Sequence, residues 1–140
     1  MSKTILVCGA GGFIGNHMVN RLVEDGHGVI GVDVNLPEYN ETKAEAFFEY
    51  DLRRPELVEE IFDEYQIDEV YQFAADVGGA GYIFSGEHDA DVMHNSALVN
   101  LNVVRECVKN DVDRVFYSSS ACIYPEHNQM DPNNPNCEEP

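Results

Sequence analysis

Short apolar runs and longer helical patterns alternate along this chain. Runs of four to seven residues, rich in β-branched and aromatic side chains, predict strands at 4–7, 29–32, 46–50, 68–74 and 114–118. Between these runs, apolar residues recur every three or four positions and predict three helices: after residue 12, after residue 55 and over 91–109. Neither pattern is present in two further segments, which we expect to be loops: 34–42 and the glycine-rich 76–82.

Each predicted helix has one apolar face that we expect to pack on the sheet. In the first helix this face consists of Ile14, Met18 and Leu22. In the second helix, which begins at Pro55, it consists of Leu57, Val58, Ile61, Phe62 and Tyr65. In the third helix it consists of Leu98, Leu101, Val104, Cys107 and Val108.

The alternation of strands and helices predicts an α/β fold. Right-handed crossovers would place the helices on both faces of one parallel sheet. We expect a Rossmann-type doubly wound parallel sheet with the strand order 3-2-1-4-5, whose ligand site lies at the carboxyl ends of the strands. The 140 residues fit one domain, which we expect over 1–126, followed by a loop or disordered tail over 127–140.

The glycine-rich segment 8–15 carries the clearest chemical signal. Gly9 would allow a sharp turn, Gly12 would let a ligand approach the backbone, and Gly15 would let the helix pack closely on the strand. The start of that helix would present N–H groups to a diphosphate. Glycine turns also occur as plain connections, but Asp33 follows Gly15 by 18 residues, close to the spacing of an acid that binds an adenosine ribose. We therefore predict a dinucleotide, and NAD over NADP because a carboxylate repels a 2′-phosphate.

Charge and hydropathy exclude some classes of partner. Eight Lys and Arg against 26 Asp and Glu give a net charge of −18, which would repel nucleic acid and anionic membranes. This acidity fits a salty environment and a well-solvated surface equally well. No apolar run reaches the roughly 18 residues of a membrane span, and the first residues lack the features of a signal peptide. We therefore expect a cytoplasmic protein.

Cysteine and histidine do not indicate a metal site. Cys8, Cys107, Cys122 and Cys137 lack the close pairing of zinc ligands, so we expect free thiols, with Cys8 and Cys107 in the core. The five histidines also lack the spacing of metal ligands.

Several motifs together resemble the extended short-chain dehydrogenase/reductase family. They are Gly9-x-x-Gly12-Phe13-Ile14-Gly15, Asp33, Asp51-Leu52-Arg53, Ala74-Ala75 and Ser118-Ser119-Ser120. Two narrower motifs resemble the GDP-mannose 3,5-epimerase family within it: Asp-x-Gly-Gly at 76–79 and Ser-Ser-Ala-Cys-Ile-Tyr-Pro at 119–125. The resemblance extends to about Glu126.

The resemblance implies an NAD-dependent epimerase that acts on a GDP-hexose. Such an enzyme transiently oxidises C4 of the sugar, exchanges protons at C3 and C5, and reduces C4 again. The resemblance implies that NAD contacts Gly9, Gly12, Phe13, Ile14, Gly15, Asp33, Asp51, Leu52, Ala74 and Ala75. It implies that the sugar contacts Gly78, Ser120, Ala121 and Cys122.

Two of these residues have catalytic roles by resemblance. Ser120 would bind the reacting hydroxyl group, and Cys122 would exchange protons with the sugar carbons. A thiol has an ordinary pKa near 8.5, which a neighbouring cation could lower into the range of a general acid or base. The alternative for Cys122 is a small buried residue at the end of a strand.

The chain also departs from the family. The family's Tyr-x-x-x-Lys pair on a helix after the fifth strand is absent, as is the substrate-binding region. We therefore interpret the chain as the N-terminal portion of a longer, homodimeric enzyme and expect the 140 residues alone to be inactive. Two other interpretations remain: a sugar-nucleotide 4-epimerase or 4,6-dehydratase, and a catalytically inactive dinucleotide-binding module.

Overall fold

One parallel sheet of five strands organises the chain. The computed structural model describes residues 1–38, 40–78, 80–120, 123–130 and 133. The strands are β1 (Thr4–Cys8), β2 (Gly28–Asp33), β3 (Ala46–Glu49), β4 (Glu69–Gln72) and β5 (Arg114–Tyr117). Their order in the sheet is β3-β2-β1-β4-β5, and every neighbouring pair is parallel. The predicted fold class and strand order are therefore confirmed.

The helices occupy most of the predicted positions. They are α1 (Phe13–Glu24), α2 (Pro55–Glu64), α3 (Ala80–Ile83), α4 (Asp89–Lys109) and α5 (Glu126–Gln129). Two short helices were not expected: α3 interrupts the predicted loop at 76–82, and α5 lies at the start of the predicted tail. In the described helices, no segment combines the length and apolar character needed to cross a membrane.

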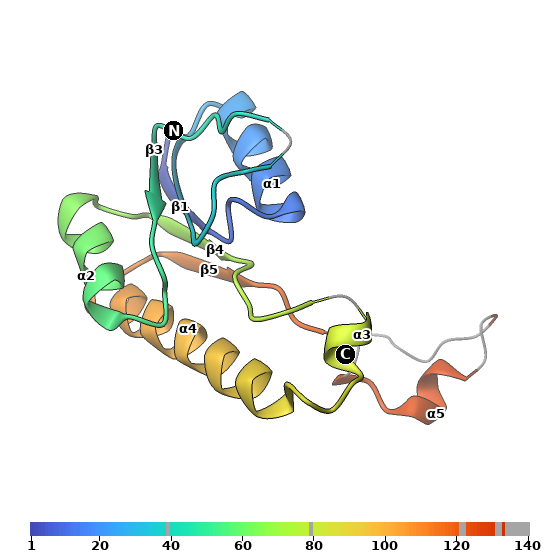
Figure 1. Cartoon of the computed structure of the whole chain (residues 1–140). Helices are drawn as coiled ribbons and strands as arrows, with labels where there is room; N and C mark the ends of the chain where they lie inside the picture. The colour runs from blue at the N-terminus through green and yellow to red at the C-terminus, as the bar shows by residue number, and fades with distance from the viewer. Residues whose placement is uncertain (39, 79, 121–122, 131–132, 134–140) are drawn as a thin grey trace.

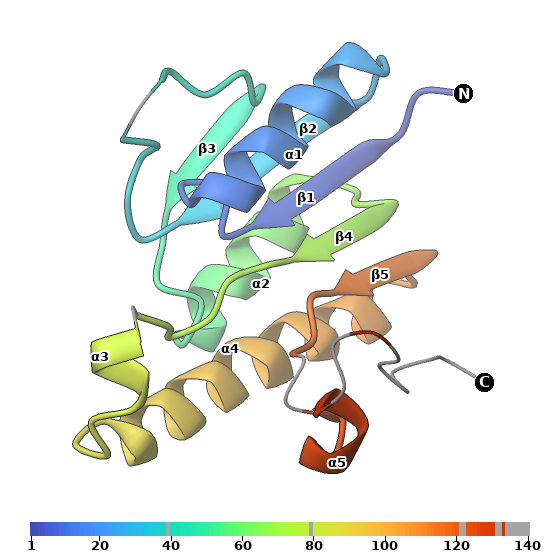
Figure 2. The same ribbon diagram turned by 90° about the vertical axis from the view of Figure 1, so that its right-hand side faces the viewer.

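The sheet separates two apolar layers. Helix α1 covers one face, whereas α2 and α4 cover the other (Figures 1 and 2). Because successive strand residues point to opposite faces, Ile5 and Val7 of β1 pack with α1, while Leu6 and Cys8 belong to the core beneath α2 and α4. All four side chains are at most 1% exposed.

The apolar face predicted for α1 is partly wrong. Ile14 is 63% exposed, and the buried positions are Gly15, Asn16, Val19 and Leu22. A Cβ atom on Gly15 would lie 1.9 Å from the carbonyl oxygen of Gly9, so the backbone at residue 15 faces the glycine turn. Since consecutive helix residues are rotated by about 100°, this contact directs Ile14 away from the sheet.

The prediction for α2 is confirmed at its centre, whereas that for α4 is wrong at three positions. Val58, Ile61 and Phe62 of α2 are buried. In α4, the exposed residues are Leu101, Val104 and Val108, and the buried residues are Val99, Asn102, Val103, Glu106 and Cys107. The face of α4 turned to the core therefore contains two polar side chains that hydropathy assigns to the surface.

One of these polar side chains, Asn102, has partners in another segment that favour the observed orientation of α4. The amide of Asn102 donates hydrogen bonds to the carbonyl oxygens of Leu52, at 2.9 Å, and Arg53, at 3.0 Å. The carboxylate of Glu106 forms ion pairs with Arg105, at 3.1 Å, and with Lys109, at 3.4 Å. Buried polar groups are tolerated where they have partners. The contacts of Asn102 with the turn at 52–53 therefore help to direct this face of α4 to the core, whereas both partners of Glu106 lie on α4 itself.

Two of the four thiols lie in the core, as expected. Cys8 and Cys107 are buried and form no disulfide. Burial raises the pKa of Cys107 to about 11, and burial raises the pKa of Cys8 further. Cys122 and Cys137 lie outside the described residues. Within the described ranges, no group of His, Cys, Asp and Glu side chains is arranged to hold a metal ion.

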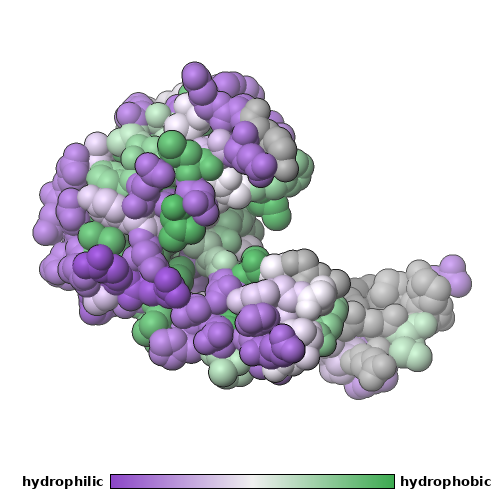
Figure 3. Space-filling model, in the orientation of Figure 1, coloured by the Kyte–Doolittle hydropathy of each residue, from purple (hydrophilic) through white to green (hydrophobic). Residues whose placement is uncertain are grey.

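The surface is hydrophilic over most of the face seen in Figure 3. On the same face the molecule is hollowed between the part that carries α1 and the part that carries α3. This hollow adjoins the carboxyl ends of β1 and β4, where the predicted motifs converge.

Candidate functional site

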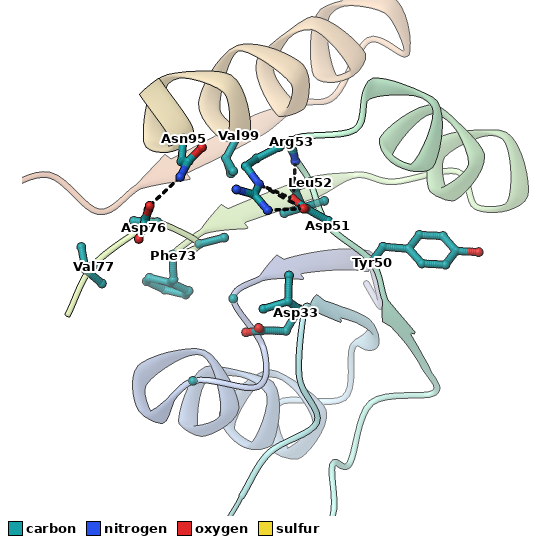
Figure 4. A pocket seen from close by; sticks show the side chains of 15 residues that line it. Asp33, Tyr50, Asp51, Leu52, Arg53, Phe73, Asp76, Val77, Asn95 and Val99 are labelled. Atoms are coloured by element: carbon teal, nitrogen blue, oxygen red, sulfur yellow. Dashed lines mark hydrogen bonds and ion pairs between the residues drawn. The ribbon is translucent and has the colours of Figure 1, made fainter. Parts of the chain in front are cut away.

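A cleft of about 380 Å³ lies at the carboxyl ends of the strands, where the chain order of the sheet reverses between β1 and β4. It is lined by Gly9, Gly12, Asp33, Val34, Tyr50, Asp51, Leu52, Arg53, Phe73, Ala74, Ala75, Asp76, Val77, Asn95 and Val99 (Figure 4). Four separate segments and α4 therefore contribute to one site.

The glycine turn forms the floor between β1 and α1. Gly9 has φ of +79°, which L-residues rarely adopt, and its N–H donates to the carbonyl of Val32 at 2.8 Å. A Cβ atom there would also lie 2.8 Å from the backbone nitrogen of Ala74. Gly9 thus makes the sharp turn that the sequence predicted, and it lets the turn lie against the end of β4.

Asp33 ends β2 beside this turn. One carboxylate oxygen, Oδ2, accepts a hydrogen bond from the N–H of Gly11 at 3.0 Å. The other oxygen accepts from the N–H of Asn35 at 3.3 Å. Backbone groups on both sides therefore orient the carboxylate at the mouth of the cleft.

A second carboxylate, Asp51, follows β3 and is held by Arg53 (Figure 4). The Nε of Arg53 lies 2.9 Å from Oδ1 and 3.0 Å from Oδ2, and a terminal nitrogen lies 2.6 Å from Oδ2. The N–H of Arg53 also donates to Oδ1 at 3.0 Å. These hydrogen bonds lower the pKa of Asp51, so its carboxylate stays ionised and points in a fixed direction.

The segment after β4 is tied to the sheet and to α4. The side chain of Gln72 accepts from the N–H of Ala74 and donates to its carbonyl, each at 3.0 Å, and also donates to Asn100 at 2.8 Å. The N–H of Asp76 donates to Ser96 at 3.1 Å. Its carboxylate accepts from Asn95 at 2.7 Å. The polar face of α4 thus fixes the wall opposite Asp33.

Tyr82 of α3 extends this network. Its hydroxyl donates to the carboxylate of Asp76 at 3.4 Å, and its ring stacks on His88 with 4.2 Å between centroids. Burial and, next, the negative charge of Asp76 raise the pKa of Tyr82. The tyrosine hydroxyl therefore stays protonated and serves as a hydrogen-bond donor at neutral pH.

The cleft gathers seven of the cofactor residues predicted from the sequence. They are Gly9, Gly12, Asp33, Asp51, Leu52, Ala74 and Ala75. Three others do not line it: Phe13 and Ile14 are exposed on α1, and Gly15 is buried against the turn. Gly78 and Ser120 are exposed and lie outside the lining, while Ala121 and Cys122 fall outside the described residues.

Sequence reasoning missed several lining residues. Arg53 and Asp76 both stand inside recognised motifs but received no role, although a charged residue next to a predicted ligand contact is itself a signal. Asn95 lies on α4, where no motif was recognised. Its partner Asp76 is 19 residues earlier, so no local pattern pairs them.

The charge of the cleft constrains how it could hold a diphosphate. Among the described residues that line it, three are aspartates and Arg53 is the only lysine or arginine. Arg53 is already paired with Asp51. The N–H of Gly12 already donates to the carbonyl of Gly9 at 3.1 Å. The backbone donors suited to phosphate oxygens are therefore the N–H groups in the first turn of α1, which have no intrahelical acceptor.

Comparison with known proteins gives related enzymes. The chain is 37% identical over 131 residues to GDP-mannose 3,5-epimerase 1 of Oryza sativa subsp. indica, a match that covers 92% of this chain and 34% of the rice protein. It is 34% identical over 134 residues to UDP-glucose 4-epimerase of Neisseria meningitidis serogroup C, where the match covers 87% and 38%. UDP-glucose 4-epimerase of Thermus thermophilus, solved in complex with NAD, has a TM-score of 0.71 and 29% identity over 84% of this chain and 37% of that one.

The chain thus spans between a third and two fifths of the length of these relatives. The family match covers nearly all of this sequence. Residues 5–140 match the family described as NAD dependent epimerase/dehydratase, and the chain belongs to that family.

Proposed function

We propose that this chain is the NAD-binding portion of a sugar-nucleotide epimerase. In this proposal Asp33 binds the adenosine ribose, Asp51 and Leu52 bind the adenine, and the turn at Gly9–Gly12 with the first residues of α1 binds the diphosphate. The observation that carries the proposal is one cleft in which a glycine turn, two oriented carboxylates and the end of β4 meet. Ala74 and Ala75, with small side chains, would leave room for the cofactor beside that strand.

Phe13, Ile14 and Gly15 have indirect roles in this proposal. Phe13 and Ile14 would contribute backbone N–H groups at the start of α1, because their side chains point to solvent. Gly15 would act by bringing α1 against the turn. When bound, NAD would supply reversible hydride transfer with the sugar.

The substrate we propose is a GDP-hexose, with the reaction of a GDP-mannose 3,5-epimerase. The motifs at 76–79 and 119–125 support this choice, with Gly78, Ser120, Ala121 and Cys122 at the sugar and Ser120 and Cys122 in catalysis. The alternative is a sugar-nucleotide 4-epimerase or 4,6-dehydratase, because the chain is also 34% identical to a UDP-glucose 4-epimerase. A catalytically inactive dinucleotide-binding module is a third candidate, since the cleft is lined by the residues proposed for the cofactor.

Calorimetric titration of the chain with NAD tests the cofactor proposal. We expect one NAD per chain and weaker binding by Asp33→Ala, because that change removes a charged acceptor for the ribose. The absence of heat above the dilution control would refute the proposed site. Turnover of a sugar nucleotide by these 140 residues alone would refute our further proposal that this portion is inactive by itself.

Isotope exchange separates the candidate reactions in the longer protein that the proposal requires. In deuterated water a 3,5-epimerase places deuterium at C3 and C5, whereas a 4-epimerase leaves both positions unlabelled. If Cys122 moves one of these protons, Cys122→Ser should abolish label at one carbon while NAD affinity is retained, because a hydroxyl is a far weaker acid than a thiol. Full labelling by that variant would exclude Cys122.

We also propose a homodimer for the protein that contains this chain. Leu101, Val104 and Val108 recur at i, i+3 and i+7 along α4 and are 67%, 49% and 74% exposed. A twofold axis beside this helix would bring the apolar stripe of one copy against the same stripe of the other.

The division of the chain into a domain over 1–126 and a tail over 127–140 is likewise a proposal.

A further inference from the structure

One buried amide connects α4 to the segment that carries Asp51. Asn102 is 9% exposed, and its Nδ2 donates to the carbonyl oxygens of two successive residues, Leu52 at 2.9 Å and Arg53 at 3.0 Å. Both amide hydrogens are therefore directed at a turn about 50 residues earlier in the chain.

Packing alone does not call for an amide at this position. The neighbouring buried positions on the same helix, Val99 and Val103, are apolar, and Leu52 is only 4% exposed. A buried amide is unfavourable unless its polar atoms are paired, and an apolar side chain of similar volume would fill the space. What Asn102 adds, beyond filling the core, is a fixed position for the backbone of residues 52 and 53.

That backbone in turn controls the carboxylate of Asp51. The N–H of Arg53 donates to Oδ1 of Asp51, and the guanidinium of the same residue grips both carboxylate oxygens. The carbonyl of Arg53 is the group that Asn102 holds. Figure 4 shows Arg53 and Asp51 facing each other on the wall of the cleft next to Val99 of α4. A continuous series of hydrogen bonds therefore runs from α4 through Arg53 to the carboxylate.

We propose that Asn102 is a positioning residue for recognition of the adenine base. This inference rests on the proposed NAD site, in which Asp51 accepts a hydrogen bond from the 6-amino group of adenine. Asn102 holds the turn so that the carboxylate meets that amino group and does not shift to another donor. The property that Asn102 confers is selectivity for a 6-amino purine, more than affinity for dinucleotides in general.

Nicotinamide hypoxanthine dinucleotide is the probe for this selectivity. Hypoxanthine has a carbonyl oxygen in place of the 6-amino group and carries a proton on the adjacent ring nitrogen. A fixed carboxylate meets the carbonyl oxygen and is repelled by it. A carboxylate on a loosened turn can move and accept a hydrogen bond from the ring N–H, so loss of positioning lowers the discrimination between the two dinucleotides.

The experiment compares the dissociation constants of NAD and of the hypoxanthine analogue by calorimetry. For the wild-type chain we expect NAD to bind about tenfold more tightly or better, as expected for one hydrogen bond to a charged group. For Asn102→Leu we expect the ratio to fall to about twofold or less. Asn102→Ala is the second variant, in case leucine does not fit.

Val103→Ala is the matched control because it removes core volume from the adjacent position of α4 but no hydrogen bond to the turn. It should lower thermal stability and keep the wild-type ratio. The inference would be overturned if both Asn102 variants kept the wild-type ratio of the two dissociation constants. It would also be overturned if this ratio fell to about twofold or less in Val103→Ala. If the wild-type chain binds neither dinucleotide, the proposed function itself fails; if it binds both equally, the cofactor site stands and adenine recognition by Asp51 fails.

Discussion

The N–H of Gly11 donates a hydrogen bond to Oδ2 of Asp33 at 3.0 Å, so the glycine turn and the end of β2 share one carboxylate. A charge fixed at this place would repel a 2′-phosphate and accept hydrogen bonds from ribose hydroxyls. We therefore predict that the chain binds NAD at least about tenfold more tightly than NADP.

Asp33→Asn separates the charge from the contact, because an amide oxygen can still accept from Gly11. We expect its preference for NAD to fall toward unity, with weaker NAD binding and stronger NADP binding. Calorimetric titration of the wild-type chain and of Asp33→Asn, each with NAD and with NADP, measures this preference. Equal affinity of the wild-type chain for NAD and NADP would contradict the prediction.

Gly15 and Gly12 should respond differently to the same substitution. A Cβ atom at Gly15 would lie 1.9 Å from the carbonyl oxygen of Gly9, so Gly15→Ala should separate α1 from the turn and destabilise the fold by about 2–3 kcal/mol. At Gly12 the nearest such atom is 3.4 Å away, which is ordinary contact. Gly12→Ala should keep its stability and lose about tenfold or more in NAD affinity.

Denaturant unfolding and calorimetry on the two glycine variants measure these effects independently. If both variants lost stability alike, Gly12 would have a structural role and not the proposed contact with the cofactor. Gly26→Ala provides a reference for backbone strain alone, since φ there is +86° and nothing lies near the added methyl group.

The Arg53–Asp51 pair predicts a pH-dependent contribution to stability. Because Arg53 lowers the pKa of Asp51 in the folded chain, the contribution is fully present above the ordinary carboxyl pKa of about 3.9 and is lost as pH falls through the lowered value. The two side chains are 45% and 29% exposed, so Arg53→Gln should lower the free energy of unfolding by less than about 1 kcal/mol at pH 7.

Urea unfolding of the wild type and of Arg53→Gln between pH 7 and pH 3 follows this contribution. The difference between them should be constant down to about pH 4 and shrink below it. A difference that grew on acidification would show that Arg53 stabilises the chain through another group.

The apolar stripe on α4 predicts an effect on assembly without an effect on folding. Leu101 is 67% exposed, so Leu101→Asp should leave the thermal midpoint of the monomeric chain almost unchanged. In the protein that forms the proposed dimer, it should raise the dissociation constant by at least about a hundredfold, because a carboxylate would be buried at the contact. Sedimentation velocity measures the monomer and the dimer. An unchanged dissociation constant would show that this face of α4 does not form the dimer contact.

The fold was predictable because strand and helix periods are local properties of the sequence. The five strands and their order follow from short β-branched runs separated by helical spacing. The face of α4 was not predictable in the same way. Asn102 is buried because its amide has partners in another segment, and hydropathy alone places Leu101 and Val104 inside instead.

The sequence could predict those residues of the candidate site whose type or position is set by the backbone. The turn at Gly9 requires a positive φ, and Asp33 lies at a fixed distance along a strand–helix–strand unit. Arg53 and Asn95 act through the side chains of Asp51 and Asp76, respectively. Such a pairing depends on how segments meet in space, so spacing along the chain does not reveal it.

Two asparagines of α4, Asn95 and Asn102, also fix the number of helix residues between them. Asn95 contacts Asp76, and Asn102 contacts the turn at 52–53, seven residues or about 10 Å farther along the helix axis. Adding or removing one residue between them would rotate one contact by about 100° away from the cleft. Natural variants of this fold should therefore keep residues 95–102 of α4 free of insertions and deletions.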